Sequence, residues 1–163
     1  MRTSTSKLSS EAERSSLRHL VKKNAARLLP LAVRQRSFFI NDTHPHVIIN
    51  TGNQLPAAVL SALLYFITHR CHRSCIKVNA HEYADSLLIK ISITGSVNYQ
   101  SLLSILPGLQ VFSEKINGEL LISSSLANHT DISFSFLNRN SNCNSIVKLN
   151  KNDENYINYL KAS

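Results

Sequence analysis

The chain has 163 residues, enough for one ordinary domain, and 43% of them are hydrophobic, which suits a packed core. Its longest apolar stretch, residues 57–68, is too short to cross a bilayer, and no secretory signal is visible, so we expect a cytoplasmic protein. The net charge of +8 is concentrated in residues 1–36, which hold nine Lys and Arg against two Glu. An electrostatic partner is therefore expected to meet this segment.

The N-terminal segment is predicted to form one helix. Residues 1–9 are polar and expected to be disordered, whereas residues 10–36 have the pattern of a basic amphipathic helix. Pro30 is expected to bend or break this helix near its end. Its apolar side chains recur at spacings that place them on one face: Leu17, Val21, Leu28 and Leu31. Beside this stripe, a ridge of Arg14, Arg18 and Lys22 is predicted on the same helix.

The remaining elements alternate between strands and helices. We predict strands at 37–41 and 47–50, a helix at 54–69, strands at 75–80 and 86–94, a helix at 97–106 that ends at Pro107, a possible continuation at 109–116, and a hairpin at 119–136. This order predicts an α+β domain over residues 37–137, a two-layer sandwich of a mixed β-sheet with helices on one face. Residues 138–163 are rich in asparagine and are predicted to be a flexible tail.

The hairpin carries the most informative motif. Residues 118–124 read Gly-Glu-Leu-x-Ile-x-Ser, and residues 130–136 read Thr-x-Ile-x-Phe-x-Phe. This pattern resembles the closing hairpin of the ATP-binding domain of sensor histidine kinases, the GHKL fold. Residues 34–42, 59–69 and 88–95 resemble, in the same order, the family's linker and first strand, its asparagine-box helix and the strand that enters its first glycine box. The resemblance spans roughly residues 30–137 and implies that fold, preceded by the remnant of a dimerisation helix.

The positions that the resemblance assigns to the nucleotide hold residues unsuited to it. The family has two asparagines on the helix, one of them for magnesium, and Ala62 and Phe66 align there without an oxygen ligand. Ile93 replaces the aspartate that binds adenine, and Gly95 alone remains of the first glycine box. The hairpin loop keeps Thr130 but has no glycine, and no second glycine box is recognisable. We therefore expect a degenerate pseudoenzyme without cofactor or metal, which acts in two-component signalling by protein–protein interaction.

The resemblance also implies an assembly. A lone helix cannot keep an apolar stripe in water, so the stripe must fold back, pair with a second copy or dock on a partner. Because the helix occupies the place of a dimerisation helix, we expect a homodimer through Leu17, Val21, Leu28 and Leu31. The domain is then expected to stay folded as a monomer when residues 1–33 are deleted.

Two alternatives come from other functional classes. The first is an enzyme, either an ATPase with a rearranged pocket or a histidine phosphotransfer protein that uses His19, whose cationic neighbours would help to hold a phosphoryl group. The second is a nucleic-acid-binding module that uses residues 14–36. That segment has no interleaved aromatic residue and matches no DNA-reading motif, so nucleic acid is the less favoured partner.

Metal binding is not expected at either histidine cluster. Cys71 and Cys75 with His69 or His72 could hold zinc, but a Cys-x3-Cys spacing without a second pair is a weak signal, and the intervening arginines oppose a cation. The other cluster is a pair in a turn without a third ligand, His44 and His46.

Overall fold

The order of elements follows the sequence prediction closely. A computed structural model describes residues 14–50, 54–124 and 128–138. Its elements are β1 (Arg14–Ser16), α1 (Leu17–Arg34), β2 (Phe38–Asn41), β3 (Ile48–Asn50), α2 (Leu55–Arg70), β4 (Cys71–Tyr83), β5 (Ser86–Val97), α3 (Tyr99–Glu114), β6 (Glu119–Ser124) and β7 (His129–Leu137). The predicted disordered N-terminus and nearly all of the asparagine-rich tail lie outside the described residues.

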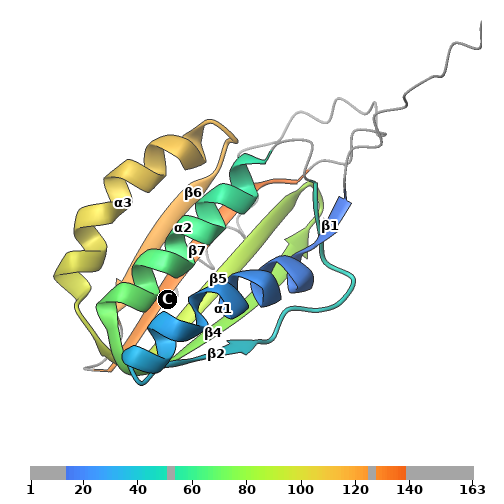
Figure 1. Cartoon of the computed structure of the whole chain (residues 1–163). Helices are drawn as coiled ribbons and strands as arrows, with labels where there is room; N and C mark the ends of the chain where they lie inside the picture. The colour runs from blue at the N-terminus through green and yellow to red at the C-terminus, as the bar shows by residue number, and fades with distance from the viewer. Residues whose placement is uncertain (1–13, 51–53, 125–127, 139–163) are drawn as a thin grey trace, which may run out of the picture.

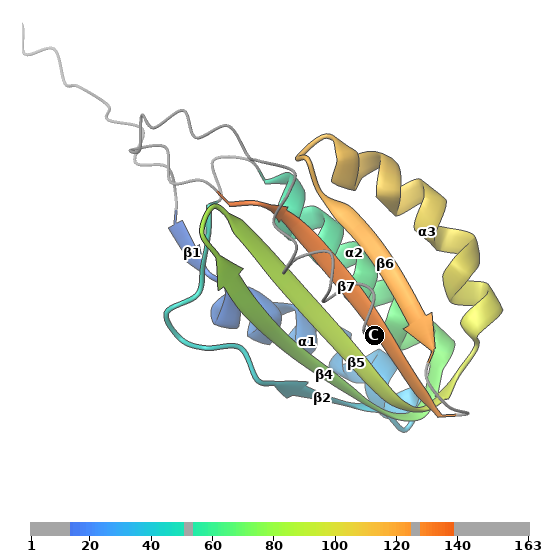
Figure 2. The same ribbon diagram turned by 180° about the vertical axis from the view of Figure 1, so that it is seen from behind.

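The main sheet has five strands in the order β2-β4-β5-β7-β6. β2 runs parallel to β4 and the other neighbours are antiparallel, so the sheet is mixed as predicted. α1, α2 and α3 all cover one face, and no described helix covers the other, which we call the open face (Figures 1 and 2). The predicted two-layer α+β fold is therefore confirmed. β3 departs from the expectation, because it pairs with β1 in a separate two-stranded sheet.

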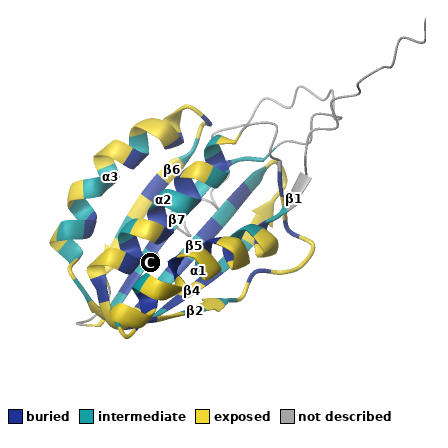
Figure 3. Cartoon of the chain, viewed as in Figure 1, coloured by how far each residue is buried: buried dark blue, intermediate teal, exposed yellow. Residues whose placement is uncertain are grey.

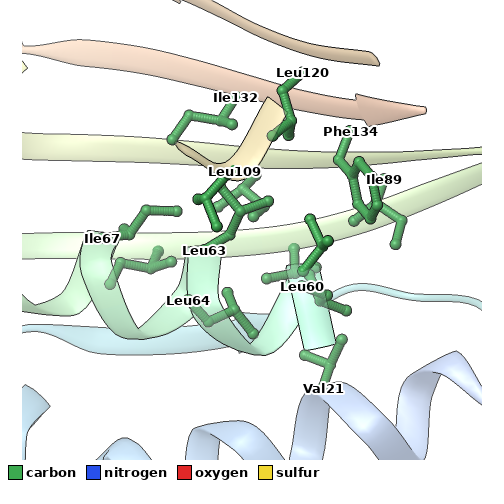
Figure 4. Packing of buried hydrophobic residues seen from close by; sticks show 14 of the residues in the cluster. Val21, Leu60, Leu63, Leu64, Ile67, Ile89, Leu109, Leu120, Ile132 and Phe134 are labelled. Carbon is green, nitrogen blue, oxygen red and sulfur yellow. The ribbon is translucent and has the colours of Figure 1, made fainter. Parts of the chain in front are cut away.

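The core lies between the helices and the sheet. β5 and β7 alternate between buried and partly exposed residues, the pattern of strands with one buried face. α2 crosses the middle of the sheet, and its inner side is buried against the strands (Figure 3). Leu63 of α2 lies beside Leu109 of α3, and Ile132 and Phe134 of β7 complete the layer (Figure 4). Phe134 and Phe136, two positions apart on β7, are both buried on the same face.

α1 belongs to the same core, which corrects the expected assembly. Leu17, Val21 and Leu28 are buried in their own chain, and Leu31 packs partly buried against the same cluster. Val21 points toward α2 in Figure 4, and the Leu17 amide donates a 3.0 Å hydrogen bond to the carbonyl of Val47. The apolar stripe is already covered by its own domain. The expected homodimer seam through these four residues is therefore wrong.

Three local predictions at the helices also need correction. Arg14 lies in β1 and not in α1, so the expected helical spacing holds only for Arg18 and Lys22. α1 continues through Pro30, and α3 continues through Pro107 instead of ending there. Both prolines are exposed, so the carbonyl group that each leaves unpaired one turn earlier can be hydrated.

Gln110 of α3 reaches the outer edge of the sheet. β6 is an edge strand that pairs only with β7. The Leu120 amide of β6 donates a 3.0 Å hydrogen bond to the Gln110 side-chain oxygen, and the Gln110 amide donates to Glu114 at 3.3 Å. α3 is thereby fixed to the strand edge as well as to the core. Across the described residues, no helix is both long and apolar enough to cross a membrane.

Candidate functional site

The residues aligned with the family's nucleotide pocket are held by α2, β5 and β7. Ala62 and Phe66 lie one turn apart on α2, both partly buried and packed against the core. Ile93 of β5 is directly opposite Thr130 of β7. Ile93 is 0% exposed and Thr130 is 2% exposed, so these two side chains are part of the packed interior. The positions thus contribute to packing, and the helix pair offers no oxygen ligand for magnesium.

Gly95 has a structural reason to be glycine. Its φ of +132° is a conformation that other residues rarely adopt. A Cβ atom at this position would lie 2.6 Å from the carbonyl oxygen of Arg73 and 2.7 Å from Ser74. Here β4 has an irregularity between His72 and Cys75 and passes close to β5. The last glycine of the first box is therefore required by strand packing.

The connection from β5 to α3 leaves no space for a phosphate-binding loop. β5 ends at Val97 and α3 begins at Tyr99, so Asn98 is the whole connector. Its side chain accepts a 3.0 Å hydrogen bond from the Ser101 amide and caps α3, and its own amide donates to the Arg70 carbonyl at 3.1 Å. The segment where a second glycine box would fall is helix, with Gly108 inside it.

The cysteine–histidine cluster has the properties of packing residues. Cys71 is buried, and burial raises its pKa to about 12, against a small opposing effect of a hydrogen bond with Ser74. Without a metal ion this thiol is therefore neutral at pH 7, as expected for a buried cysteine that packs in the core. The His69 ring lies against Tyr65 at 4.6 Å between centroids. Among the described residues, no three His, Cys, Asp or Glu side chains are grouped as metal ligands.

The other histidine candidates are exposed. His44 and His46 have ring centroids 5.0 Å apart in the loop before β3. His19 lies on the outer side of α1, next to exposed Arg18. Its helix is part of the α+β core and does not stand apart from it, and its role as phosphoacceptor stays a prediction.

A polar network on the open face of the sheet was missed by the sequence analysis. The Asp131 carboxylate of β7 accepts a 2.6 Å hydrogen bond from the Ser92 hydroxyl of β5 and lies 3.1 Å from the Lys90 ammonium. The His129 Nε2 is 3.3 Å from the same carboxylate, and its Nδ1 is 3.4 Å from the Thr94 hydroxyl. Polar residues at every second position of two predicted strands were the available signal. Only the register of the two strands shows that they meet.

The network fixes the Asp131 carboxylate in its charged form. Burial raises the pKa of Asp131, but the Ser92 hydrogen bond, the Lys90 ammonium and His129 together outweigh burial, so the pKa lies below its usual value. A carboxylate with these partners is a poor general base, because protonation would weaken each contact. We conclude that the network joins β5 to β7.

Comparison with known protein families and with curated proteins found no match. Solved histidine kinase structures share the fold. The nucleotide-free catalytic domain of histidine kinase ThkA has a TM-score of 0.62 at 11% identity, with 77% of this chain and 95% of that chain covered. Histidine kinase AdeS of Acinetobacter baumannii has a TM-score of 0.63 at 13% identity, with 78% and 68% covered.

ThkA in complex with the response regulator protein TrrA also matches, with a TM-score of 0.60 at 13% identity and with 78% of this chain and 42% of that chain covered. At such identities the similarity establishes the fold alone. The predicted resemblance to the histidine kinase catalytic domain is confirmed at that level.

Proposed function

We propose that this chain is a degenerate histidine-kinase-like domain that does not bind ATP and acts in cytoplasmic signalling by binding another protein. The observation that carries the proposal is the one-residue connection between β5 and α3. A phosphate-binding loop needs several residues with free backbone amides and space for the phosphates. Here Asn98 is occupied with capping α3.

The remaining pocket positions support the same proposal. Ala62 and Phe66 cannot ligate magnesium, and Ile93 is buried where an adenine-binding carboxylate would have to stand. The glycine that remains is explained by the close approach of β4 and β5. Three separate requirements of nucleotide binding, the phosphate loop, the magnesium ligand and the adenine-binding carboxylate, lack suitable residues in this proposal, while the hydrophobic core is intact.

A domain of this fold that binds no nucleotide can still act by binding another protein. In the solved complex, histidine kinase ThkA is bound to a response regulator protein. The fold is thus compatible with binding a signalling protein, and this use of the fold needs no nucleotide pocket. We infer that the present chain has kept this kind of role.

The nucleotide part of the proposal is tested by thermal unfolding with millimolar Mg-ATP. A ligand at 100 times its Kd would stabilise the folded state by about 2.7 kcal/mol, which is a clear rise in Tm. We expect no rise for this chain, and a rise for the ThkA catalytic domain measured beside it as a positive control. A rise that requires magnesium would contradict the proposal and favour an ATPase with a rearranged pocket.

A further inference from the structure

We propose that the end of the molecule at which α1 and α2 finish is a docking surface for an acidic protein segment that also carries apolar side chains. We call this surface the arginine end and define it by Arg34, Arg36, Arg70 and Arg73. The inference rests on the proposed function, since it names the surface that the partner would use.

Backbone hydrogen bonds bring the four arginines together. The Arg73 amide donates a 2.9 Å hydrogen bond to the Gln35 carbonyl, and the Ser74 amide donates a 3.1 Å hydrogen bond to the Ser37 hydroxyl. The segment after α1 is thereby joined to the segment after α2, and the C-terminal ends of these two helices lie together in Figure 1. Two stretches that are far apart in the sequence form one surface.

The four guanidinium groups are available to a partner. All four residues are exposed, and within the described part of the chain no side-chain hydrogen bond or ion pair engages them. Arg34 and Arg70 lie in the last turns of their helices, where cations stabilise the helix dipole. That explanation does not apply to Arg36 and Arg73, which follow the helices.

The carboxylates of the domain lie elsewhere. Glu82 and Asp85 flank the turn between β4 and β5, and Glu114 and Glu119 flank the connection from α3 to β6, all at the opposite end of the sheet. The other two described carboxylates have their own partners, Asp42 with Lys77 at 2.9 Å and Asp131 with Lys90 at 3.1 Å. This separation of charge attracts and orients an acidic partner toward the arginine end.

The backbone at two of the arginines is strained. Arg36 has a φ of 55° and Arg73 has a φ of 50°, both in the left-handed region. For a residue other than glycine this region costs about 1 kcal/mol or more, so glycine would make each turn more stable. Ala84 and Asn117 have a similar φ in turns at the opposite end of the sheet, so the conformation alone does not mark a site. At Arg36 and Arg73 it coincides with exposed, charged side chains on one surface.

Apolar side chains next to the arginines favour a protein as the partner. Val33 is 67% exposed and directly precedes Arg34, and Phe38 is 57% exposed and follows Arg36 by two residues. Tyr65 is 47% exposed, and its ring contacts that of His69, the residue before Arg70. Arginine and aromatic residues are enriched in protein–protein interfaces. Phe38 and Tyr65 could each also stack on a nucleobase, but Val33 could not, so Val33 is the residue that favours a protein segment.

The test is a titration of the full chain, followed by amide chemical shifts, with a glutamate-rich helical peptide that carries leucines at every third or fourth position. We expect shifts confined to the arginine end, and no binding of the same peptide with glutamine in place of glutamate. The double variant Arg36→Gly/Arg73→Gly is expected to bind at least about tenfold more weakly while its Tm rises, because the strain is relieved. A structural role for these arginines would not give these opposite changes.

The matched control is Arg18→Ala/Lys22→Ala, which removes the same charge from the exposed side of α1 away from the arginine end. Its binding is expected to stay within about threefold of the unmodified chain. Arg34→Gln/Arg70→Gln gives a second test that leaves both strained turns unchanged, and it too should weaken binding. Equal losses in the control and test variants, or no binding of the acidic peptide, would overturn the proposal.

Two further probes decide the class of partner. Single-stranded oligonucleotides and phosphatidylserine-containing vesicles are titrated under the same salt conditions, and tighter binding of either through the same arginines would replace the protein partner. The Mg-ATP measurement probes the pocket and the peptide titration probes the arginine end. Failure of either one is therefore distinguishable from failure of the other.

Discussion

Asp131 is the residue whose charge matters most on the open face of the sheet. Since its folded pKa is below the usual value, its contribution to stability is present above about pH 4 and is lost as the pH falls through the lowered pKa. Asp131→Asn is expected to reduce the free energy of unfolding at pH 7 by about 1–3 kcal/mol, because Ser92 and Lys90 lose a charged acceptor.

Urea unfolding of both proteins at pH 7 and pH 3 measures this effect, and the difference between them should shrink at pH 3. Asp42→Asn is the matched control, because Asp42 also pairs with a lysine but is exposed, so the change should be smaller. A pH-independent difference for Asp131→Asn would show that packing and not charge is responsible.

Two glycines, Gly95 and Gly108, are expected to respond oppositely to alanine. Gly95→Ala should lower the free energy of unfolding by about 2–4 kcal/mol without any nucleotide present, because the new Cβ would meet the backbone of β4. Gly108→Ala, inside α3 with open space around it, should raise stability by about 0.5–1 kcal/mol. Chemical denaturation measures both changes. A neutral Gly95→Ala would remove the packing explanation for this glycine.

At the scale of elements, α1 is expected to be indispensable to the fold. Deleting residues 1–33 removes buried Leu17, Val21 and Leu28 and exposes the side of α2 that they cover, so we expect an unfolded product and not the folded monomer that the sequence suggested. Circular dichroism and light scattering check this directly. A truncated chain that remains folded would show that α1 is an accessory to the core.

A pair of point variants tests the same helix more finely. Leu17→Ala should cost about 2–5 kcal/mol because it empties a fully buried site, whereas Leu29→Ala on the exposed side should change stability by no more than about 0.5 kcal/mol. Equal effects of the two substitutions would show that the buried face of α1 is assigned incorrectly.

The elements show what local sequence can and cannot determine. The hairpin of β6 and β7 was predictable because period-two alternation and the burial of Phe134 follow from neighbouring residues. The face of α1 was equally clear, but an apolar stripe says only that it must be covered, not by what. α1 has no break at Pro30 and α3 does not end at Pro107, because both prolines lie on exposed sides, where water can replace the lost hydrogen bond.

The candidate site also has residues that the sequence identified and features that it did not. Ala62, Phe66 and Ile93 were found by alignment with a motif, and their burial is what packing requires. The one-residue connector at Asn98 was invisible, because the sequence placed the end of the strand and the start of the helix only approximately. The network around Asp131 depends on the pairing of two strands that are distant in the sequence.

At the scale of the whole molecule, folding changes the meaning of the charge distribution. The sequence places the basicity in residues 1–36 and leaves the rest nearly neutral. In the folded domain, Arg34 and Arg36 meet Arg70 and Arg73 from the part that looked neutral, while the carboxylates that form no ion pair within the described residues gather at the far end. The composition of each segment therefore predicts its net charge but not where the charges lie in the folded domain.

The hydrogen bond between Gln110 and the edge of β6 has a consequence for how the protein behaves at high concentration. An edge strand with free amides is a template for strands of other molecules, and growth from such edges ends in fibrils. Gln110 occupies the Leu120 amide with the domain's own side chain, so an incoming strand would first have to displace it. Strand addition is therefore opposed at the start of β6, where an incoming strand cannot pair with Leu120 unless this bond breaks.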